Sequence, residues 1–435
     1  MMSQTSLESK LDALQCHFTW DLDPSRSKLF HLRYQLEDIG TEEGNSWLGH
    51  IYNLWGYVQY KLGFTEDAQS LFNKAAEAFC QTRRADEGPW LVVNYGNQAW
   101  LHHHLGEQAE SQAYLSKVDA LMNKYPSPSQ DELHPEIYAE KAWTLMKFSA
   151  DKKQLAADYF QRAIRMQPDM VEWFTSRVIA LVSASMHSNT GLDADVLEEM
   201  RIAKEEDTEN LYLAALYLQE CAKKGERVED EARELARKIL MNPVSSYSGV
   251  KPLLWVYVRY VSVDEAIDLA EEALRHHPDV RYLKRCVAFC YRSKIIFIRD
   301  GPPDKSMIEK AISLHEELIS IYPESSLLRK IDLANIYAKS NHSQAKTEQI
   351  YQELLERDLD PADKQMVYNR YAIHLHVVLK DTCRSVRYNM RAAEIPIQSY
   401  FRQNSVTNLE KIKDSNWHPM RGEVKEFLEK LPEPQ

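Results

Sequence analysis

The segment 151–168, DKKQLAADYFQRAIRMQP, places small and large residues at fixed intervals. Ala156, Phe160, Ala163 and Pro168 follow one another at steps of four, three and five residues. In a helix the two alanines allow a neighbouring helix to approach, and the phenylalanine fills the gap between them. Pro168 cannot continue a helix and therefore ends it. The spacing predicts a helix with one face packed closely against a second helix.

The same register recurs along the chain, which is the signature of a repeat architecture. Recurrences, some of them degenerate, fall at Ala68, Phe72 and Ala75; Ser111, Leu115 and Val118; Ala232, Ala236 and Pro243; Ala266, Ala270, Ala273 and Pro278; and Ala311, Leu318 and Pro323. The step from Pro243 to Pro278 is 35 residues, close to the roughly 34 residues of a tetratricopeptide repeat. Each such repeat is a pair of helices that packs on its neighbours. We therefore predict an all-α chain, a tetratricopeptide-repeat α-solenoid.

Composition limits the classes of protein to which the chain can belong. With 13 Gly, 17 Pro and 44% hydrophobic residues in 435, the chain is expected to fold, mostly as helices. A formal net charge of −12 argues against bulk nonspecific nucleic-acid binding. An acidic chain can still carry a local basic lining. The N-terminus lacks the basic start and apolar run of a signal peptide, and no stretch approaches the ~20 apolar residues of a membrane span. The cytoplasm is the default location.

The repeats and the breaks between them predict the organisation of the chain. Nine helix pairs are expected between Ser46 and Ala393. The expected parts are an N-terminal helical cap (1–45), an N-terminal repeat subdomain (46–241), a candidate hinge (242–252), a C-terminal repeat subdomain (253–400) and a C-terminal helical cap (401–435). Within the last part, helices are expected at 409–413 and 421–431, because terminal repeats need a polar outer face.

Motifs for catalysis or metal binding are missing from the sequence. It contains no phosphate loop, nucleophile elbow or zinc signature. The tract His102–His104 resembles a metal site, but on a helix the three side chains point in three directions and cannot share one ion. We predict no enzyme, no cofactor and no metal site.

One aromatic residue has a neighbour that suggests a binding role. Trp143 lies four residues before Lys147, so both side chains share one face of a repeat's first helix. First helices line the inner wall of such a solenoid. There an indole could stack on a nucleic-acid base while the lysine contacts a phosphate. A half-buried tryptophan beneath a lysine that reaches to solvent would produce the same pattern, and the sequence leaves both interpretations open.

Several segments carry a resemblance to a known family. They are CHFTW (16–20), NLWGYV (53–58), YGNQAW (95–100), PE (135–136) with AWTLMK (142–147), SVDEA (262–266), CY (290–291) and DLA (332–334). In these segments the chain resembles the interferon-induced proteins with tetratricopeptide repeats. The resemblance implies a superhelix with a concave central channel, in a cytoplasmic antiviral protein without enzymatic activity. Several members hold the 5′ end of single-stranded RNA, triphosphate or capped, in that channel. Others bind double-stranded RNA or protein partners, and many oligomerise.

The resemblance also implies an RNA site, which this chain matches only in part. The family's cap-contacting tryptophan matches Trp143, and its phosphate-contacting lysine matches Lys147. An apolar position of the family's groove matches Ile179, and a family arginine falls on Lys251, which keeps the positive charge. The family's key phosphate-binding arginine falls on Ser183, and the nearest basic residue is Arg177. A family tyrosine falls on Lys153, and a His-Gln pair falls on Arg285 and Cys286. Our hypothesis is that Lys153 and Arg285 restore the lost positive charge, since serine cannot replace an arginine fork on a phosphate.

Two functions therefore remain open from the sequence. The first is RNA binding for antiviral defence, with Lys147, Lys251, Arg177 and Arg285 on the RNA backbone and Trp143 stacking. The second is a protein scaffold that forms homo- or hetero-oligomers with family members or binds signalling proteins. The charge of −12 and Ser183 favour the scaffold, whereas the Trp143–Lys147 pair and Lys251 favour RNA.

Overall fold

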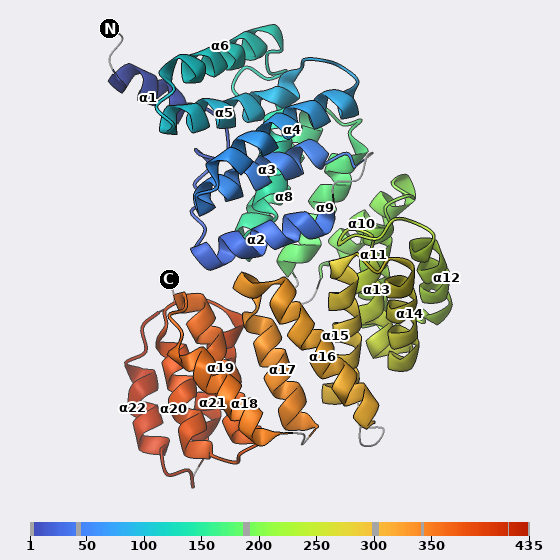
Figure 1. Cartoon of the computed structure of the whole chain (residues 1–435), viewed down its shortest axis with the longest axis vertical. Coiled ribbons are helices and arrows are strands. Elements are labelled where there is room, and N and C mark those ends of the chain that lie inside the picture. The colour runs from blue at the N-terminus through green and yellow to red at the C-terminus, as the bar shows by residue number, and fades with distance from the viewer. Residues whose placement is uncertain are drawn as a thin grey trace. The chain divides into compact units, whose positions relative to one another are not determined.

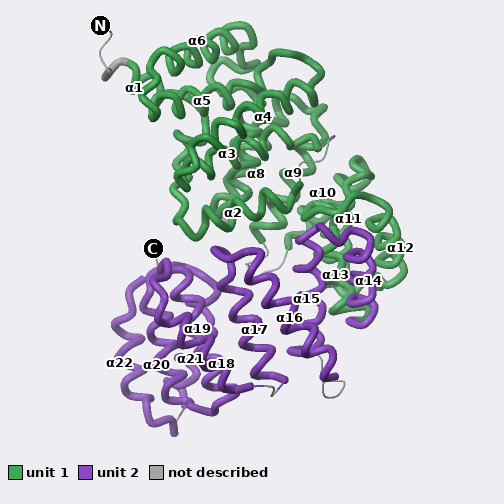
Figure 2. Tube along the Cα trace, viewed as in Figure 1, with its two compact units in different colours: residues 1–262 green, residues 263–435 purple. Residues whose placement is uncertain are grey.

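The computed structural model describes residues 4–40, 45–185, 192–297, 304–340, 343–415 and 417–433 (Figure 1). Every regular element within these ranges is a helix. The chain divides into two compact units, unit 1 (Met1–Ser262) and unit 2 (Val263–Gln435) (Figure 2).

Unit 1 is built from consecutive helices that pack in pairs, such as α3 with α4, α5 with α6 and α7 with α8. Its α-helices are α1 (Gln4–Asp12), α2 (Arg26–Ile39), α3 (Leu48–Leu62), α4 (Thr65–Arg83), α5 (Val92–His104), α6 (Gln108–Lys124), α7 (Pro135–Leu145), α8 (Ala150–Met166), α9 (Val171–Ser185), α10 (Ala194–Glu206), α11 (Leu211–Lys223), α12 (Glu229–Leu240) and α13 (Val250–Val256). A short 3₁₀ turn, η1 (Pro89–Leu91), precedes α5, and a π-helical turn, η2 (Tyr257–Val261), follows α13.

The repeat register explains why these pairs form. Ala156, Phe160 and Ala163 are all fully buried on α8, as the spacing predicts. In the pair α3–α4, a Cβ atom at Gly56 would lie 2.7 Å from the ring of Phe72, so glycine is needed for the two helices to approach this closely. The same complementarity of a small and a large residue, repeated along the chain, produces the solenoid.

A buried loop ties two helices of unit 1, α5 and α7, together. The backbone N–H of His17, in the CHFTW segment, donates to Asn97 Oδ1 on α5 at 3.0 Å. Its ring nitrogens lie 3.0 Å from Asn97 Nδ2 and 3.0 Å from Thr144 Oγ1 on α7. Burial lowers the pKa of His17 to about 3, so the ring is neutral. Nδ1 then accepts from Asn97, and Nε2–H donates to Thr144. The motif is thus a structural connection between repeats.

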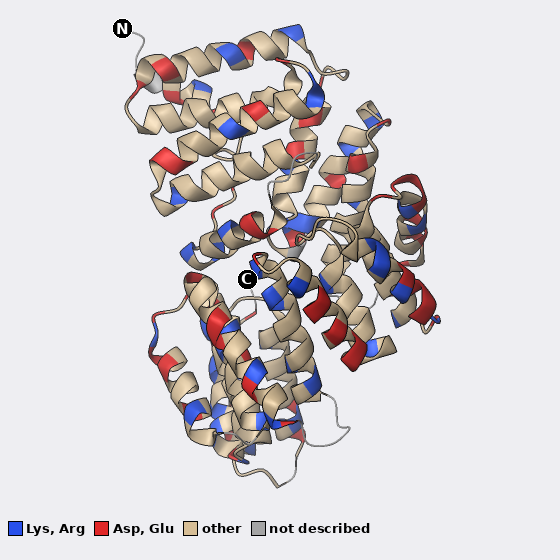
Figure 3. Ribbon diagram, turned by 45° about the vertical axis from the view of Figure 1, so that its right-hand side comes forward, with Lys and Arg blue, Asp and Glu red and all other residues tan. Residues whose placement is uncertain are grey.

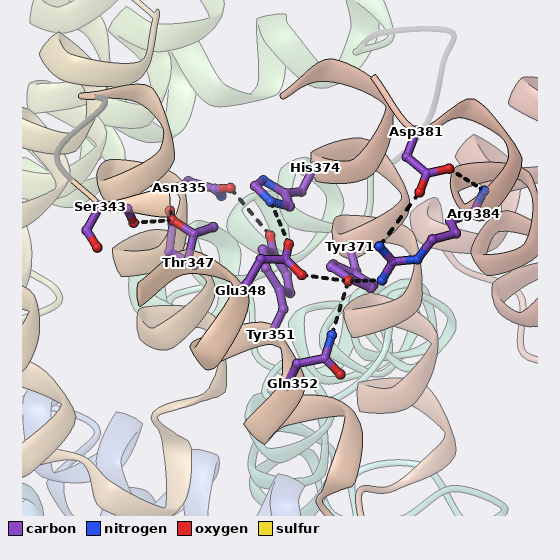
Figure 4. Close-up of polar contacts among 11 residues, drawn as sticks. Asn335, Ser343, Thr347, Glu348, Tyr351, Gln352, Tyr371, His374, Asp381 and Arg384 are labelled. Carbon is purple, nitrogen blue, oxygen red and sulfur yellow. Dashed lines mark hydrogen bonds and ion pairs between the residues drawn. The ribbon is translucent and has the colours of Figure 1, made fainter. Parts of the chain in front are cut away.

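Unit 2 continues the pattern of paired helices. Its elements are α14 (Val263–His276), α15 (Arg281–Phe297), α16 (Lys305–Ile321), a 3₁₀ turn η3 (Pro323–Ser325), α17 (Leu327–Lys339), α18 (Gln344–Glu356), α19 (Pro361–Val377), α20 (Thr382–Glu394), α21 (Tyr400–Asp414) and α22 (Arg421–Glu429). A polar network links α18, α19 and α20 (Figure 4). Glu348 accepts from the Tyr371 hydroxyl at 3.0 Å and lies 3.0 Å from His374 Nε2. Arg384 donates to the Tyr371 oxygen at 2.6 Å. The network satisfies polar groups between neighbouring repeats.

The structure contains a helix at each position of the predicted pairs, and α6, α11 and α14 match their predicted bounds. The helix predicted at 409–413 was too short, because α21 begins at Tyr400. The Ser399 side chain accepts from the backbone N–H groups of Phe401 and Arg402 and so caps that helix early. The hinge proposed at 242–252 stays a prediction. Its last residues already belong to α13, and the compact units separate after Ser262.

Candidate functional site

Trp143 and Lys147 do share one face at the end of α7. The Lys147 ammonium lies 4.3 Å from the centre of the Trp143 ring and 4.9 Å from that of Tyr247. It also donates a hydrogen bond to the Tyr247 hydroxyl. The ammonium is therefore held by two aromatic rings, a favourable cation–π arrangement.

Lys153 of α8 lies near two other lysines, Lys28 of α2 and Lys147 just after α7, and we call these three residues the lysine cluster. All three side chains are partly buried. Burial, with a smaller contribution from the charge of Lys153, lowers the pKa of Lys147 to about 7 and that of Lys28 to about 8. Burial also lowers the pKa of Lys153. Lys153 therefore lies close enough to influence both of the other ammonium groups.

The lysine cluster lacks a neutralising partner in the part of the chain that the structure describes. No carboxylate there raises the pKa of any of its three ammonium groups. Lys152, the sequence neighbour of Lys153, is by contrast occupied, since it donates to the backbone oxygen of Asp21 at 2.6 Å. Partly buried charges of one sign are costly unless a counter-charge joins them. The cluster is consequently suited to an anion with several oxygen acceptors, such as a phosphate.

The loop before α13 fixes Tyr247 above Lys147. The Ser246 N–H donates to the backbone oxygen of Asp38 on α2 at 2.9 Å, and the Tyr247 ring lies 5.6 Å from that of Tyr212. Gly249 has φ +86°, and a Cβ atom there would lie 2.6 Å from the Leu211 oxygen. A side chain at Gly249 would clash, so the loop conformation depends on this glycine.

Three predicted residues, Arg177, Ile179 and Ser183, lie on α9. Arg177 forms an ion pair with Glu199 of α10, so its charge already has a partner. Ile179 is partly buried and packs against the small core that contains Val178 and Met200. Ser183 is partly buried. Arg177 therefore differs from the residues of the lysine cluster, because its guanidinium is paired with a carboxylate and holds α9 to α10.

Lys251 and Arg285 belong to different units. Lys251 is exposed in the first turn of α13, in unit 1. Arg285 is on α15, in unit 2, where its guanidinium lies 5.4 Å from the centre of the Tyr322 ring and 6.0 Å from that of Tyr282. Within unit 1, Lys153 lies close enough to Lys147 to lower its pKa.

The stacking role of Trp143 stays a prediction, and the structure shows the surroundings of its ring. Its side chain is only 2% exposed and belongs to the main hydrophobic core of unit 1. Its ring lies 6.0 Å from Trp47 at an interplanar angle of 18°, and 6.1 Å from His50. The structural alternative, a buried tryptophan beneath a lysine, is the one that the structure contains.

Sequence reasoning missed Lys28 and Tyr247. A signal for Lys28 was present, because it precedes the buried Leu32 and Leu36 at steps of four residues and so lies on the apolar face of α2. No local pattern marks Tyr247, which lies in a loop. Tyr247 reaches Lys147, and Lys28 comes close to Lys153, through tertiary contacts.

The rest of the described chain offers less distinctive chemistry. Basic and acidic side chains are interspersed along most of the helices (Figure 3). No group of three or more His, Cys, Asp or Glu residues in the described ranges could hold a metal ion. None of the described helices is long and apolar enough to cross a bilayer. A local excess of positive charge, rather than the overall charge, distinguishes the lysine cluster.

Comparisons with known proteins bear on the family. No protein-family model matches the chain. It is 25% identical to Protein IFIT1 homolog B of Homo sapiens, over 93% of this chain and 88% of that protein. It is 26% identical to the antiviral innate immune response effector IFIT1 of Macaca fascicularis, over 93% of this chain and 87% of that protein. Human interferon-induced protein with tetratricopeptide repeats 2 is 25% identical, over 94% of this chain and 88% of that protein.

Solved structures agree with this result. The human IFIT1 dimer with m7Gppp-AAAA matches with a TM-score of 0.72 and 23% identity, covering 97% of this chain and 96% of that one. The human IFIT1 dimer with PPP-AAAA matches with a TM-score of 0.69 over the same shares. At this identity the likeness shows the fold, a tetratricopeptide-repeat α-solenoid. The relatives that align along almost its whole length make the chain similar, at 25–26% identity, to interferon-induced proteins with tetratricopeptide repeats.

Proposed function

We propose that this protein is an interferon-induced, cytoplasmic antiviral effector that binds the phosphorylated 5′ end of single-stranded viral or other non-self RNA without catalysis. The observation that carries the proposal is the lysine cluster, three partly buried ammonium groups without a neutralising carboxylate in the described chain. Support also comes from a relative named as an antiviral innate immune response effector, and from human IFIT1 structures solved with PPP-AAAA and m7Gppp-AAAA.

In this proposal the terminal phosphates supply the missing counter-charge. Phosphate oxygens accept charge-assisted hydrogen bonds from Lys28, Lys147 and Lys153. Tyr247 adds a donor, because its oxygen accepts from Lys147 and its O–H remains available for a phosphate oxygen. Lysine is a point charge without the rigid fork of arginine, so the cluster attracts phosphate with less geometric constraint than the arginine absent at Ser183 would impose.

The first test is direct binding of a short 5′-triphosphate RNA at fixed salt, with Lys147→Glu as the variant. Removing one ammonium and adding a carboxylate should raise the Kd by roughly 30-fold or more. Lys117→Glu is the matched control, because Lys117 on α6 also stands over an aromatic ring, 4.4 Å from the centre of Tyr114. Equal Kd values for wild type and both variants would contradict the proposal.

A protein scaffold is the second candidate, and the net charge of −12 and Ser183 favour it. In that role the chain would oligomerise with family members or bind signalling proteins through its repeats. The solved human IFIT1 relatives are described as dimers. Sedimentation of this chain alone and mixed with a family member tests this role. An oligomer or a complex in that experiment, combined with no RNA binding in the first test, would support the scaffold instead.

A further inference from the structure

We propose that Glu140 of α7 is a protonated carboxylic acid in the folded protein at neutral pH, and that its ionisation at higher pH destabilises unit 1. This proton-linked device is independent of the proposed function. Two features of unit 1 carry it: a chain of buried amides that ends at Glu140, and the absence of a positive charge that could offset an ionised carboxylate there in the described part of the chain.

A chain of buried hydrogen bonds, which we call the amide relay, crosses unit 1 and ends at Glu140. Gln98 Nε2 donates to Asn94 Oδ1 at 3.0 Å within α5. Asn94 Nδ2 then donates to Asn53 Oδ1 on α3 at 2.8 Å, and Asn53 Nδ2 donates to Glu140 Oε1 at 2.7 Å. Each of these four side chains is at most 3% exposed. Because the relay consists of neutral amides, it brings a hydrogen-bond donor to Glu140 but no positive charge.

Arg83 reaches this part of α7, but its charge already has a partner. Its Nη2 donates to Glu136 Oε2 at 2.9 Å, one turn before Glu140, and Glu136 is 5% exposed. Within the described ranges no cation lowers the pKa of Glu140, whereas the charge of Glu136 raises it. An ionised Glu140 would therefore be a buried charge without a counter-charge, which is costlier than the neutral acid.

Titratable groups on the segments packed against α7 supply no positive charge either. Cys16 lies near Glu140, and burial raises the pKa of its thiol to about 12. Burial lowers the pKa of His17 to about 3, and it lowers that of His50 on α3 well below the usual range. The thiol and both imidazole rings are consequently neutral at neutral pH, so they do not stabilise a carboxylate by charge.

Two charged neighbours complete the surroundings. Lys141, the next residue on α7, stands 4.9 Å from the centre of the Tyr159 ring on α8. Glu172 on α9 raises the pKa of Glu136 and so adds negative charge near this face. Burial raises the pKa of Glu140 to about 8; its hydrogen bond within the relay opposes the rise, and the charge of Glu136 adds to it. The carboxyl group therefore keeps its proton at neutral pH.

The direction of the pH effect follows from comparing the folded and unfolded states. Glutamate in an unfolded chain has a pKa of about 4.3, so between that value and about 8 the folded protein holds a proton that the unfolded chain has lost. The stability that this proton contributes is complete below about pH 4 and is lost as the pH rises toward 8. His17 and Lys147 act in the opposite direction, because their pKa values are lowered in the folded protein. Comparison with a variant that cannot ionise isolates Glu140.

The experiment measures urea unfolding of wild type and Glu140→Gln between about pH 5.5 and 8.5 at constant ionic strength. Glutamine keeps an oxygen that accepts from Asn53 and cannot ionise. The unfolding equilibrium constant of wild type, divided by that of the variant at the same pH, should rise by roughly tenfold per pH unit and level off above about pH 8. Glu110→Gln, at an exposed position of α6, is the control and should give a ratio that does not change with pH.

A ratio for Glu140→Gln that is as independent of pH as that of the control would overturn the proposal, because Glu140 would then ionise alike in both states. A second measurement needs no variant. The infrared carbonyl band of a protonated carboxylic acid, which ionised carboxylates lack, should be present in folded wild type in D2O at neutral pH and disappear on unfolding in urea. A folded protein without that band would also overturn the proposal, even if Glu140→Gln failed to fold.

Discussion

At the scale of single residues, Lys147 is the group whose protonation should control RNA binding. Burial lowers its pKa to about 7, and Lys153 adds to the shift. Below that pH the free protein already carries the ammonium. Above it the free protein holds a neutral amine, and a bound phosphate must draw in a proton. Affinity for a phosphorylated end should consequently fall as the pH rises through 7, by up to about tenfold per unit.

This pH dependence can be measured as the Kd of triphosphate RNA between about pH 6.5 and 8.5 at constant ionic strength. Lys147→Arg keeps its charge throughout and should show a shallower dependence. A residual slope is expected, because Lys28 has a pKa lowered to about 8 and also titrates in this range. If the profiles of wild type and variant run parallel, Lys147 is not the group that takes up the proton.

At the scale of elements, the loop that carries His17 should be a main determinant of the stability of unit 1. Asn97→Ala leaves the buried N–H and Nδ1 of His17 without partners. Each buried polar group left unpaired costs about 1–3 kcal/mol, so we expect a loss of about 2–4 kcal/mol in the free energy of unfolding. Urea unfolding followed by tryptophan fluorescence measures it, since only Trp417 of the nine tryptophans lies in unit 2.

The control for this variant is Ser116→Ala on α6. That hydroxyl is exposed and bonds only the Gln112 oxygen, so its loss should change the free energy of unfolding by less than about 0.5 kcal/mol. An Asn97→Ala protein as stable as this control would show that the loop does not tie α5 to α7 energetically.

The sequence predicted contacts between helices that are adjacent in the chain, but not contacts between distant segments. The register of Ala156 and Phe160 acts between helices adjacent in the chain, so it revealed the helix pairs. The Trp143–Lys147 contact joins residues only four positions apart, so it too was predictable from local spacing. Tyr247 reaches Lys147, and Lys28 comes close to Lys153, only through packing of segments far apart in sequence, which no local spacing encodes. The burial of Trp143 depended on Trp47, and the sequence left that alternative open.

At the scale of the whole molecule, a formal net charge of −12 makes long-range attraction of RNA weak, so binding must come from a few local contacts. For single-stranded nucleic acid the slope of log K against log salt is about −0.7 for each neutralised phosphate, and three lysines predict a slope of about −2. Titration of wild type with triphosphate RNA over a range of salt concentrations measures it. Lys153→Gln should make the slope shallower by about 0.7, because one contact is lost. A slope steeper than about −5 would mean that many more cations contact the RNA than the lysine cluster provides. The acidic total would then conceal an extended basic surface, and the RNA chain as well as its 5′ end would determine affinity.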